Sequence, residues 1–467
     1  MCRRSCYGHR RRPGRWSTFR RSPFVPCPSS VRLPYAVRPP VGPRPSSPRP
    51  SAVRPPVVHR PGRAPETSPI IVAVTDLAQA DTAPPGAGRP GGVALAALRR
   101  AAPALLLYAG TRVLGLVVLA VWGAAAGKSA HQLLSARWDS LWYARIAEEG
   151  YGYTIHLADG SVHSNLAFFP LLPWLERGIS AVTPLSVPDA GLAVSSITSL
   201  LAAWGIFAVG DLVYGRRVGI TLTVLWGVLP VGIVQSMAYS ESLFTALAAW
   251  SVYAVLTRRW VWAGVLAALA GLTRPVGAAV VAAVWITAAV ELLPGGRWRQ
   301  ALRQDWRVLA GMAIAPLGWL GYVTWVGIRT DSLTGYFDVQ NGWGNGFDGG
   351  LAFAAFIGGL LVHPPFVAGI ALLLAVAALL WLYVSCIRQS QPLPLLVYGG
   401  AVLVLALAAK GYFGSKPRLL IPAFPVLIPL AIALARLRPA RTALVLGSVG
   451  LASAAYAAWW LHGSGPP

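Results

Sequence analysis

The sequence predicts an all-α polytopic membrane protein. Its 467 residues are 55% hydrophobic and only 12% charged, and the mean hydropathy is +0.55. An ordinary soluble domain carries roughly 25% charged residues. From residue 99 onward, apolar runs recur with lengths close to the roughly 20 residues that cross a bilayer. These observations exclude a water-soluble globule and favour one membrane domain over several soluble domains.

The first part of the chain, residues 1–98, has a different composition. It is rich in Arg and Pro, with little that could pack into a core, and is therefore predicted to be disordered. It also holds much of the net charge of +24. Such a basic tail is expected either to lie on anionic cytoplasmic lipid headgroups or to float free. Met is rare in the chain, which leaves an alternative start codon near Val72 or Val74 open. Translation from there would leave most of the tail unmade.

The transmembrane domain is expected at residues 99–467. Eleven helices are predicted there, at 103–126, 189–210, 218–238, 242–257, 261–273, 275–293, 308–328, 366–386, 393–409, 419–435 and 442–461. The pair that meets at Arg274 is short, which suggests two half-spanning helices, since backbone breaks at membrane depth only where protein or water covers it. Arg112, inside the first helix, must find a partner or water there.

The charges of the short loops predict the orientation. With a cytoplasmic N-terminus, the inside loops collect most of the cations: Arg216, Arg217, Arg258, Arg259, Arg297, Arg299, Arg303, Arg307, Arg388, Arg436, Arg438 and Arg441. Three outer segments follow, at 127–188, 329–350 and 410–418. The first is unusually long for a chain whose other connections are tight, which points to function. The protein is thus predicted to sit in the cell membrane with its site on the extracytoplasmic side.

Asp139 stands at the start of an amphipathic stretch in the first outer segment. Leu141, Trp142, Tyr143 and Ile146 follow it at helical spacing, and Trp and Tyr favour the headgroup level of a membrane. The stretch 140–149 is therefore predicted to be an interfacial helix that holds the Asp139 carboxylate just above the hydrocarbon. A carboxylate so placed suits general-base catalysis. Alternatively, Asp139 simply caps this helix.

Five stretches of sequence, in this order, resemble a known family. They are Arg-Trp-Asp-Ser-Leu-Trp-Tyr at 137–143, Asn-Leu-Ala-Phe-Phe-Pro-Leu-Leu-Pro at 165–173, Tyr-Ser-Glu-Ser-Leu-Phe at 239–244, Gly-Leu-Thr-Arg-Pro-Val-Gly at 271–277 and Pro-Arg-Leu-Leu-Ile-Pro-Ala-Phe-Pro at 417–425. Together they are similar to GPI mannosyltransferase II (PIG-V-like) proteins and their actinobacterial relatives, within the GT-C superfamily of integral membrane glycosyltransferases. The resemblance spans about residues 103–435.

The resemblance implies transfer of a hexose, usually mannose, from a polyprenyl-phosphate donor to an acceptor hydroxyl on the outer face. It also implies a catalytic Asp in the first outer loop, which matches Asp139. One displacement with one base predicts inversion at the anomeric carbon. The leaving group is a lipid phosphate, which needs cations more than a general acid. The candidates for donor-phosphate binding are Arg274, Lys410, Lys416 and Arg418, and Arg offers bidentate contacts to phosphate.

Four further residues are assigned to sugar or acceptor binding: Trp138, Glu241, Gln340 and Trp343. Each assignment has a plainer alternative. Glu241 stands alone at a turn where an acid is often only solvated, and Trp gathers at this depth in aromatic belts without any ligand. Likewise, Arg274 could be an ordinary turn cation, and Lys416 and Arg418 could contact lipid headgroups at a helix end.

Cofactors and partners follow from the same reasoning. No metal site is predicted, because His156 and His163 lack a recognised ligand spacing, and no cofactor is assigned, although a divalent cation is left open. The expected partners are a polyprenyl-phosphate sugar donor, a glycolipid, glycan or protein acceptor, and membrane lipids, but no nucleic acid. Broken helices and intramembrane charges would also suit a secondary transporter or lipid flippase, which is the first rival function. A second rival is a membrane scaffold without catalytic activity, for which the large aromatic outer loop would have no purpose.

Overall fold

The computed structural model of the chain describes residues 90–292, 306–364, 366–463 and 465, with side chains from Leu95 onward. Most of residues 1–98 and the predicted inside cations Arg297, Arg299 and Arg303 lie outside these residues. Helix α2 begins at Pro90, so the first helix starts within the stretch predicted to be disordered. The helix therefore begins earlier than the predicted residue 103, because the residues after Pro90 are largely apolar.

The fold is all-α, which confirms the predicted class. Within the described residues, five helices are long and apolar enough to cross a membrane: α2 (Pro90–Ala125, from Leu95), α6 (Val187–Tyr214), α12 with α13 (Trp306–Ile314 and Leu317–Arg329), α16 (Phe366–Arg388) and α20 (Pro439–His462). A pair bent by 76°, Phe413–Leu419 with Phe424–Ala435, would make a sixth. The protein is therefore a multi-pass membrane protein.

Shorter apolar helices lie between these spans. They are α8 (Glu241–Leu256), α9 (Trp260–Gly271), α10 (Gly277–Leu292), α15 (Leu351–Val362) and α17 (Leu393–Leu407). Length and apolarity do not decide whether each of these crosses the membrane, so the count of eleven spans stays a prediction. The break predicted at Arg274 is confirmed, because α9 ends at Gly271 and α10 begins at Gly277. Helix α15 was not predicted.

Besides the short interruption at 315–316 between α12 and α13, two predicted helices are broken in the structure. The stretch 218–238 contains α7 (Arg216–Gly227), then a 3-10 turn at Gly232–Ser236. The stretch 419–435 is divided into α18 (Lys416–Leu419), a 3-10 turn at Phe424–Leu427 and α19 (Ile428–Ala435). Proline explains both corrections, because Pro230, Pro422 and Pro425 cannot donate a backbone hydrogen bond within a helix.

The smaller elements belong to the predicted outer segments. They are α3 (Ala130–Ser135), α4 (Asp139–Glu149), β1 (Thr154–His156), β2 (Val162–Ser164), a 3-10 turn at Asn165–Ala167, α5 (Leu171–Val182), α14 (Gly335–Gly342), β3 (Gly346–Phe347), β4 (Ala409–Lys410) and a 3-10 turn at Phe413–Ser415. Helix α4 confirms the helix predicted at 140–149. Strand β1 pairs antiparallel with β2, and β3 with β4, which joins the second and third outer segments.

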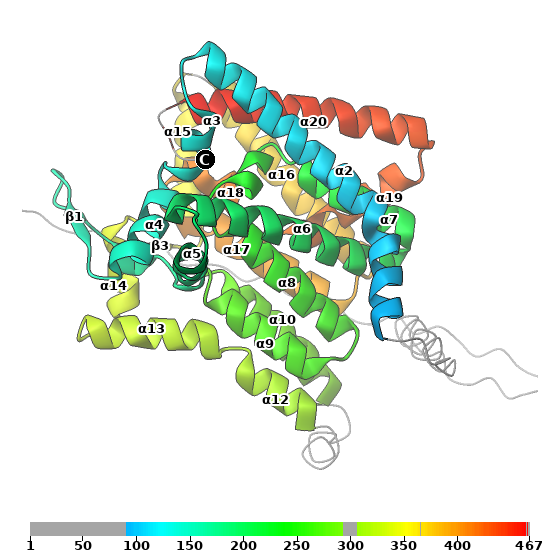
Figure 1. Ribbon diagram of the computed structural model, residues 1–467, viewed down its shortest axis with the longest axis horizontal. Coiled ribbons are helices and arrows are strands. Elements are labelled where there is room, and N and C mark those ends of the chain that lie inside the picture. Colours follow the sequence, from blue (N-terminus) through cyan, green and yellow to red (C-terminus); the bar gives the residue numbers. More distant parts are fainter. Residues whose placement is uncertain (1–89, 293–305, 365, 464, 466–467) are drawn as a thin grey trace, which may run out of the picture. The chain divides into compact units, whose positions relative to one another are not determined.

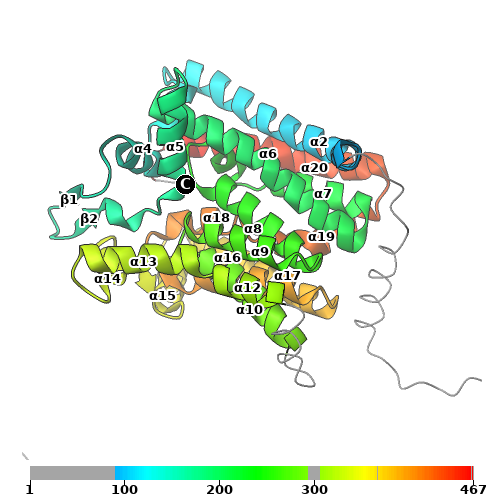
Figure 2. The same cartoon turned by 60° about the horizontal axis from the view of Figure 1, so that its bottom comes forward.

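The predicted outer segments gather at one end of the helices. Figures 1 and 2 both show α4, α5, β1 and α14 at one end, with α7 and α19 at the other. In the part of the protein between the two ends, glycines let neighbouring helices pack closely, as small residues do in membrane proteins. A Cβ on Gly318 of α13, for example, would overlap the carbonyl oxygen of Ala268 in α9. Which end faces the outside of the cell stays a prediction.

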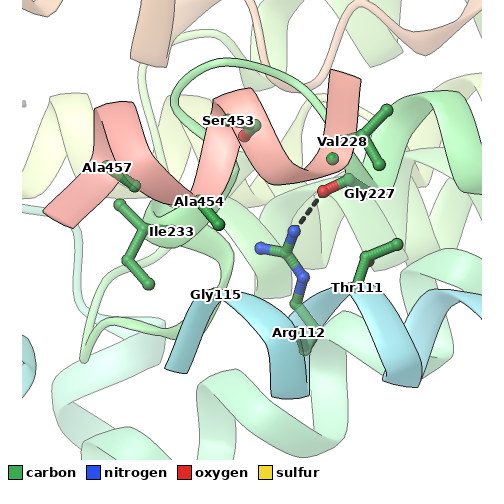
Figure 3. Close-up of a pocket in the computed structure, with 10 residues that line it drawn as sticks. Thr111, Arg112, Gly115, Gly227, Val228, Ile233, Ser453, Ala454 and Ala457 are labelled. Atoms are coloured by element: carbon green, nitrogen blue, oxygen red, sulfur yellow. Dashed lines mark hydrogen bonds between the residues drawn. The ribbon is translucent and has the colours of Figure 1, made fainter. Parts of the chain in front are cut away.

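Arg112 of α2 finds the partners that its depth requires. Its guanidinium donates to the carbonyl oxygens of Gly227 and Gly232, on either side of the break after α7. Figure 3 shows it pointing toward Gly227 beside a small pocket that Ser453 of α20 also lines. This pocket has a volume of about 10 Å³, room for one water at most. Arg112 is therefore a structural residue that satisfies carbonyls freed by a broken helix.

Glu176 of α5, outside the spans, is buried without a visible partner. It is 1% exposed, and its Oε2 has no hydrogen bond within the described residues. Burial, with a smaller contribution from Glu148, raises its pKa well above the usual range. The folded protein therefore favours the protonated form. Stability should fall as the pH rises above the pKa of Glu in the unfolded chain, roughly 4.3.

We expect Glu176→Gln to stabilise the protein, because an amide cannot ionise. The unfolding temperature in detergent should rise by a few degrees at pH 7.5 and by less at pH 5. Intrinsic Trp fluorescence during heating measures it. Glu149→Gln, at an exposed position of α4, is the control and should leave the pH dependence unchanged. A wild-type unfolding temperature that does not fall between pH 5 and 7.5 would contradict the buried, protonated carboxyl.

Candidate active site

Asp139 is held at the first position of α4 by an unusual turn. The preceding residue, Trp138, has φ +51° and ψ −119°, a conformation that non-glycine residues rarely adopt. Ser140 secures the turn, because its Oγ accepts from the Arg137 backbone N–H at 2.9 Å and donates to the Arg137 carbonyl at 2.6 Å. The backbone N–H of Asp139 approaches the Tyr239 hydroxyl at 3.4 Å. Asp139 thus heads the helix with its side chain 22% exposed.

Four of the predicted site residues form one cluster of alternating charge. Arg418 Nη1 donates to Asp139 Oδ2 at 2.6 Å, and Arg418 Nε lies 3.4 Å from Glu241 Oε1. Arg274 Nη1 lies 2.6 Å from the same oxygen of Glu241. The four residues come from four separate segments: the start of α4, the start of α8, the break between α9 and α10, and α18. Two carboxylates and two guanidiniums give the cluster no net charge.

The cluster is buried, and part of its hydrogen-bonding capacity is unused. Glu241 is 1% exposed, and the side chains of Arg274 and Arg418 are 11% and 9% exposed. The contacts to Glu241 have the distances of ion pairs but not the angles of hydrogen bonds. Within the described residues, both Glu241 oxygens and Arg418 Nε therefore lack hydrogen-bond partners. Buried polar groups are usually hydrogen-bonded, so these atoms give the cluster bonding capacity that the described residues do not use.

Two residues with hydroxyl groups, unassigned by the sequence analysis, complete the cluster. The Tyr143 hydroxyl is 2.8 Å from Ser240 Oγ, which accepts from Arg274 Nη1 at 3.0 Å. Tyr143 lies on α4 one turn after Asp139, so the two share a helix face. That i, i+4 spacing was the available signal for Tyr143. The Arg418 guanidinium also lies over the ring of Tyr239, 5.1 Å from its centroid.

The two predicted lysines lie outside the cluster. Lys416 is 5% exposed, and its Nζ donates to the carbonyls of Ala406 and Ala409 at 2.7 Å each, near the end of α17. Lys410 is exposed on β4, opposite Gly346 of β3. Lys416 therefore satisfies carbonyls at a helix end. Donor-phosphate binding by these two lysines remains a prediction.

The predicted sugar-binding residues other than Glu241 belong to the surrounding outer segments. Gln340 Nε2 donates to the Ala167 carbonyl at 3.1 Å, and Trp343 Nε1 donates to the Ser164 carbonyl at 2.9 Å. These bonds attach α14 to the first outer segment. The Trp343 ring packs against Trp142 of α4, with centroids 4.9 Å apart. The Arg137 guanidinium lies over the Trp138 ring, 3.9 Å from its centroid.

The cluster offers guanidinium groups and carboxylates, and not the ligand set of a metal site. Within the described residues, no three or more His, Cys, Asp and Glu side chains come together as a metal site would require. Asp139 and Glu241 are already matched by two guanidiniums, which would repel a divalent cation. His163 instead stacks on Trp343, with ring centroids 4.1 Å apart.

Comparisons with known proteins give similarity at the level of solved structures. No family model and no curated protein sequence matches the chain, so the PIG-V-like family is not confirmed. ArnT from Cupriavidus metallidurans bound to undecaprenyl phosphate is similar with a TM-score of 0.47 and 16% identity, over 74% of this chain and 62% of ArnT. Its apo state gives 0.44 and 16%, over 72% and 62%.

The Archaeoglobus fulgidus oligosaccharyltransferase in its apo form is also similar. Its TM-score is 0.39 at 13% identity, over 77% of this chain and 56% of the other. The chain thus spans less than two thirds of the length of each of these structures.

The pair of Asp139, which is partly buried, and Arg418, which is buried, should be strongly coupled in stability. Arg418→Gln leaves two carboxylates with one guanidinium, so it should be clearly destabilising. Adding Asp139→Asn should recover part of the loss, with a coupling energy of about 1–3 kcal/mol. Unfolding in SDS followed by Trp fluorescence measures all four members of the cycle.

The matched control is the exposed pair of Arg145 and Glu149 on α4, 3.8 Å apart. Replacing both by Gln should give a coupling energy near zero, because water screens exposed pairs. Equal coupling energies for the two cycles would contradict a buried Asp139–Arg418 pair.

Proposed function

We propose that the chain is an inverting membrane glycosyltransferase that transfers a hexose, with mannose as the first candidate, from a polyprenyl-phosphate donor to an acceptor hydroxyl. One observation carries the proposal. Four of the five stretches that resemble PIG-V-like proteins contribute one charged residue each to a single buried cluster: Asp139, Glu241, Arg274 and Arg418. If these separate stretches build one functional site, that shared site explains why each of them resembles the same family. On this proposal the chain is a PIG-V-like member of the GT-C superfamily.

Asp139 is the general base in this proposal. Arg418 binds its Oδ2, and within the described residues no hydrogen bond occupies Oδ1. The acceptor oxygen attacks the anomeric carbon and passes its proton to Asp139, while the bond from that carbon to the phosphate oxygen breaks. The electron pair leaves with the polyprenyl phosphate. A single displacement of this kind inverts the anomeric configuration.

The cluster also suits the charge change of the reaction. A sugar phosphodiester carries one negative charge, and the departing phosphate monoester carries two when it is fully ionised. Asp139 loses one negative charge as it accepts the proton, so the charge of the whole site is constant. Arg418 and Arg274 are then available to the leaving phosphate, which guanidinium binds well. Glu241, whose oxygens have no hydrogen bonds here, accepts hydroxyls of the sugar.

The proposed reaction takes place on the extracytoplasmic face, with the N-terminus in the cytoplasm. This orientation is supported by the inner-loop cations and by the position of α4, α5 and α14 at the end away from α7 and α19 (Figure 1). Lys410 and Lys416 are proposed as further cations for the donor, and Trp138, Gln340 and Trp343 as acceptor contacts. The acceptor is a glycolipid, a glycan or a protein.

We expect Asp139→Asn to reduce sugar transfer by at least about 100-fold, because the amide cannot accept the proton. The assay uses purified protein in lipid with radiolabelled polyprenyl-phosphate mannose and an acceptor extract. Glu149→Gln, on the same helix but exposed, is the control and should transfer at the wild-type rate. Equal transfer by Asp139→Asn would remove Asp139 from the mechanism. A transporter or flippase would instead show no transfer in the wild type.

The orientation of the protein in the membrane is tested separately, by labelling single cysteines on intact cells with a maleimide that does not cross the membrane. The tail cysteines Cys2, Cys6 and Cys27 are first replaced by Ser, while Cys386 is buried. Ala158→Cys, exposed between β1 and β2, should be labelled from outside. Ala440→Cys, exposed at the start of α20, should be labelled only after permeabilisation. The reverse pattern would place the cluster on the cytoplasmic side and end the proposal.

A further inference from the structure

A second cavity lies away from the charge cluster. It has a volume of about 440 Å³, within the range of small-molecule sites. It lies among the junction of α6 and α7, the end of α16, and α19, and its lining residues are Tyr214, Val218, Gln389, Pro429, Ile432, Ala433 and Arg436. Figures 1 and 2 show α7 and α19 at the end opposite α4. This cavity is therefore separate from the candidate active site.

The lining of the cavity is amphipathic. Val218, Pro429, Ile432 and Ala433 provide apolar surface, whereas Tyr214, Gln389 and Arg436 provide polar groups. The apolar side chains of α16 nearby are open to the surroundings, with Ile387 51% exposed. In a membrane protein such a surface faces lipid. A ligand that matches this lining has a polar head and an apolar body.

The charge around the cavity is positive and uncompensated. Arg217 donates to the carbonyl of Leu437, next to Arg436 in the chain, and Arg388 immediately precedes Gln389. None of Arg217, Arg388 and Arg436 is in an ion pair within the described residues.

Among the described residues, the acids Asp211 and Glu291 at this end of the protein have partners. Asp211 is bound by Arg100 through two contacts of 2.5 and 2.8 Å, and Glu291 by Arg258 at 2.9 Å. Charge complementarity therefore favours an anionic head in the cavity.

We propose that this cavity binds one anionic phospholipid of the surrounding bilayer. Its phosphate is bound by Arg436 and Gln389, and its acyl chains lie along Ile432, Pro429 and Val218. A lipid fills both halves of the lining, whereas a free phosphate would use only the polar half. Basic pockets between helices at the cytoplasmic end of membrane proteins suit anionic headgroups. The site depends on the membrane setting of the chain and not on the proposed sugar transfer.

Native mass spectrometry of the purified full chain tests the site, with phosphatidylglycerol and phosphatidylcholine of identical acyl chains as probes. We expect one tightly retained phosphatidylglycerol and weaker retention of phosphatidylcholine. Arg436→Ala should raise the Kd for phosphatidylglycerol about fivefold, which corresponds to roughly 1 kcal/mol per cation. Arg436→Lys should recover most of the affinity. Ala433→Trp should lower the affinity for both lipids, because the new side chain at this exposed position fills the apolar part.

The matched control is Arg259→Ala, an exposed cation at the start of α9 that does not line the cavity. It should leave the Kd unchanged. Equal losses from Arg259→Ala and Arg436→Ala would show only diffuse attraction to positive charge and would overturn the proposal. Equal retention of both lipids by the wild type, or unchanged binding by Ala433→Trp, would overturn it as well. Release of bound phosphatidylglycerol by millimolar inorganic phosphate would assign the site to phosphate instead.

Discussion

Matching of buried charge is the constraint on which the rest of the structure depends. Glu241 is 1% exposed, and burial of a charged carboxylate is costly unless positive charge lies beside it. Arg274 and Arg418 supply that charge from segments far apart in the chain. Arg418 in turn binds Asp139, which fixes the start of α4. These ion pairs thus hold together α8, α18, the α9–α10 break and the first outer segment. The burial of Glu241 in this way positions Arg274, Arg418 and Asp139.

The broken helices make this meeting possible, and side chains satisfy the backbone groups that each break frees. Arg112 donates to the carbonyls of Gly227 and Gly232. Trp226 donates to the carbonyl of Ile421 at 2.9 Å, and Tyr398 to that of Pro422 at the same distance. Lys416 performs this role at the end of α17. In a membrane such satisfaction is required, because lipid offers no hydrogen bonds to irregular backbone.

Hydropathy predicted most helices, because apolar length is a local property of the sequence. It missed α15, and it joined segments that Pro230, Pro422 and Pro425 separate. The charge cluster was less predictable. Resemblance suggested its members, but nothing local distinguished Arg418 from Lys416. Two residues apart on α18, they point in different directions, one toward Asp139 and the other toward the carbonyls of α17. Their partners depend on tertiary packing, which sequence spacing does not encode.

The exposure of the cluster changes across it in a way that fits the two substrates of the proposed reaction. Glu241 is almost fully buried, whereas the Asp139 side chain is 22% exposed. Arg418 lies between these carboxylates and contacts both. In the proposed mechanism the buried acid, whose Oε2 has no hydrogen-bond partner among the described residues, is protected from water and suits a donor sugar, which must not be hydrolysed. The more exposed acid suits an acceptor, which has to arrive and leave. Arg418 contacts both acids, so in the proposed mechanism a proton taken up by Asp139 changes the field at Glu241 and couples acceptor activation to the donor.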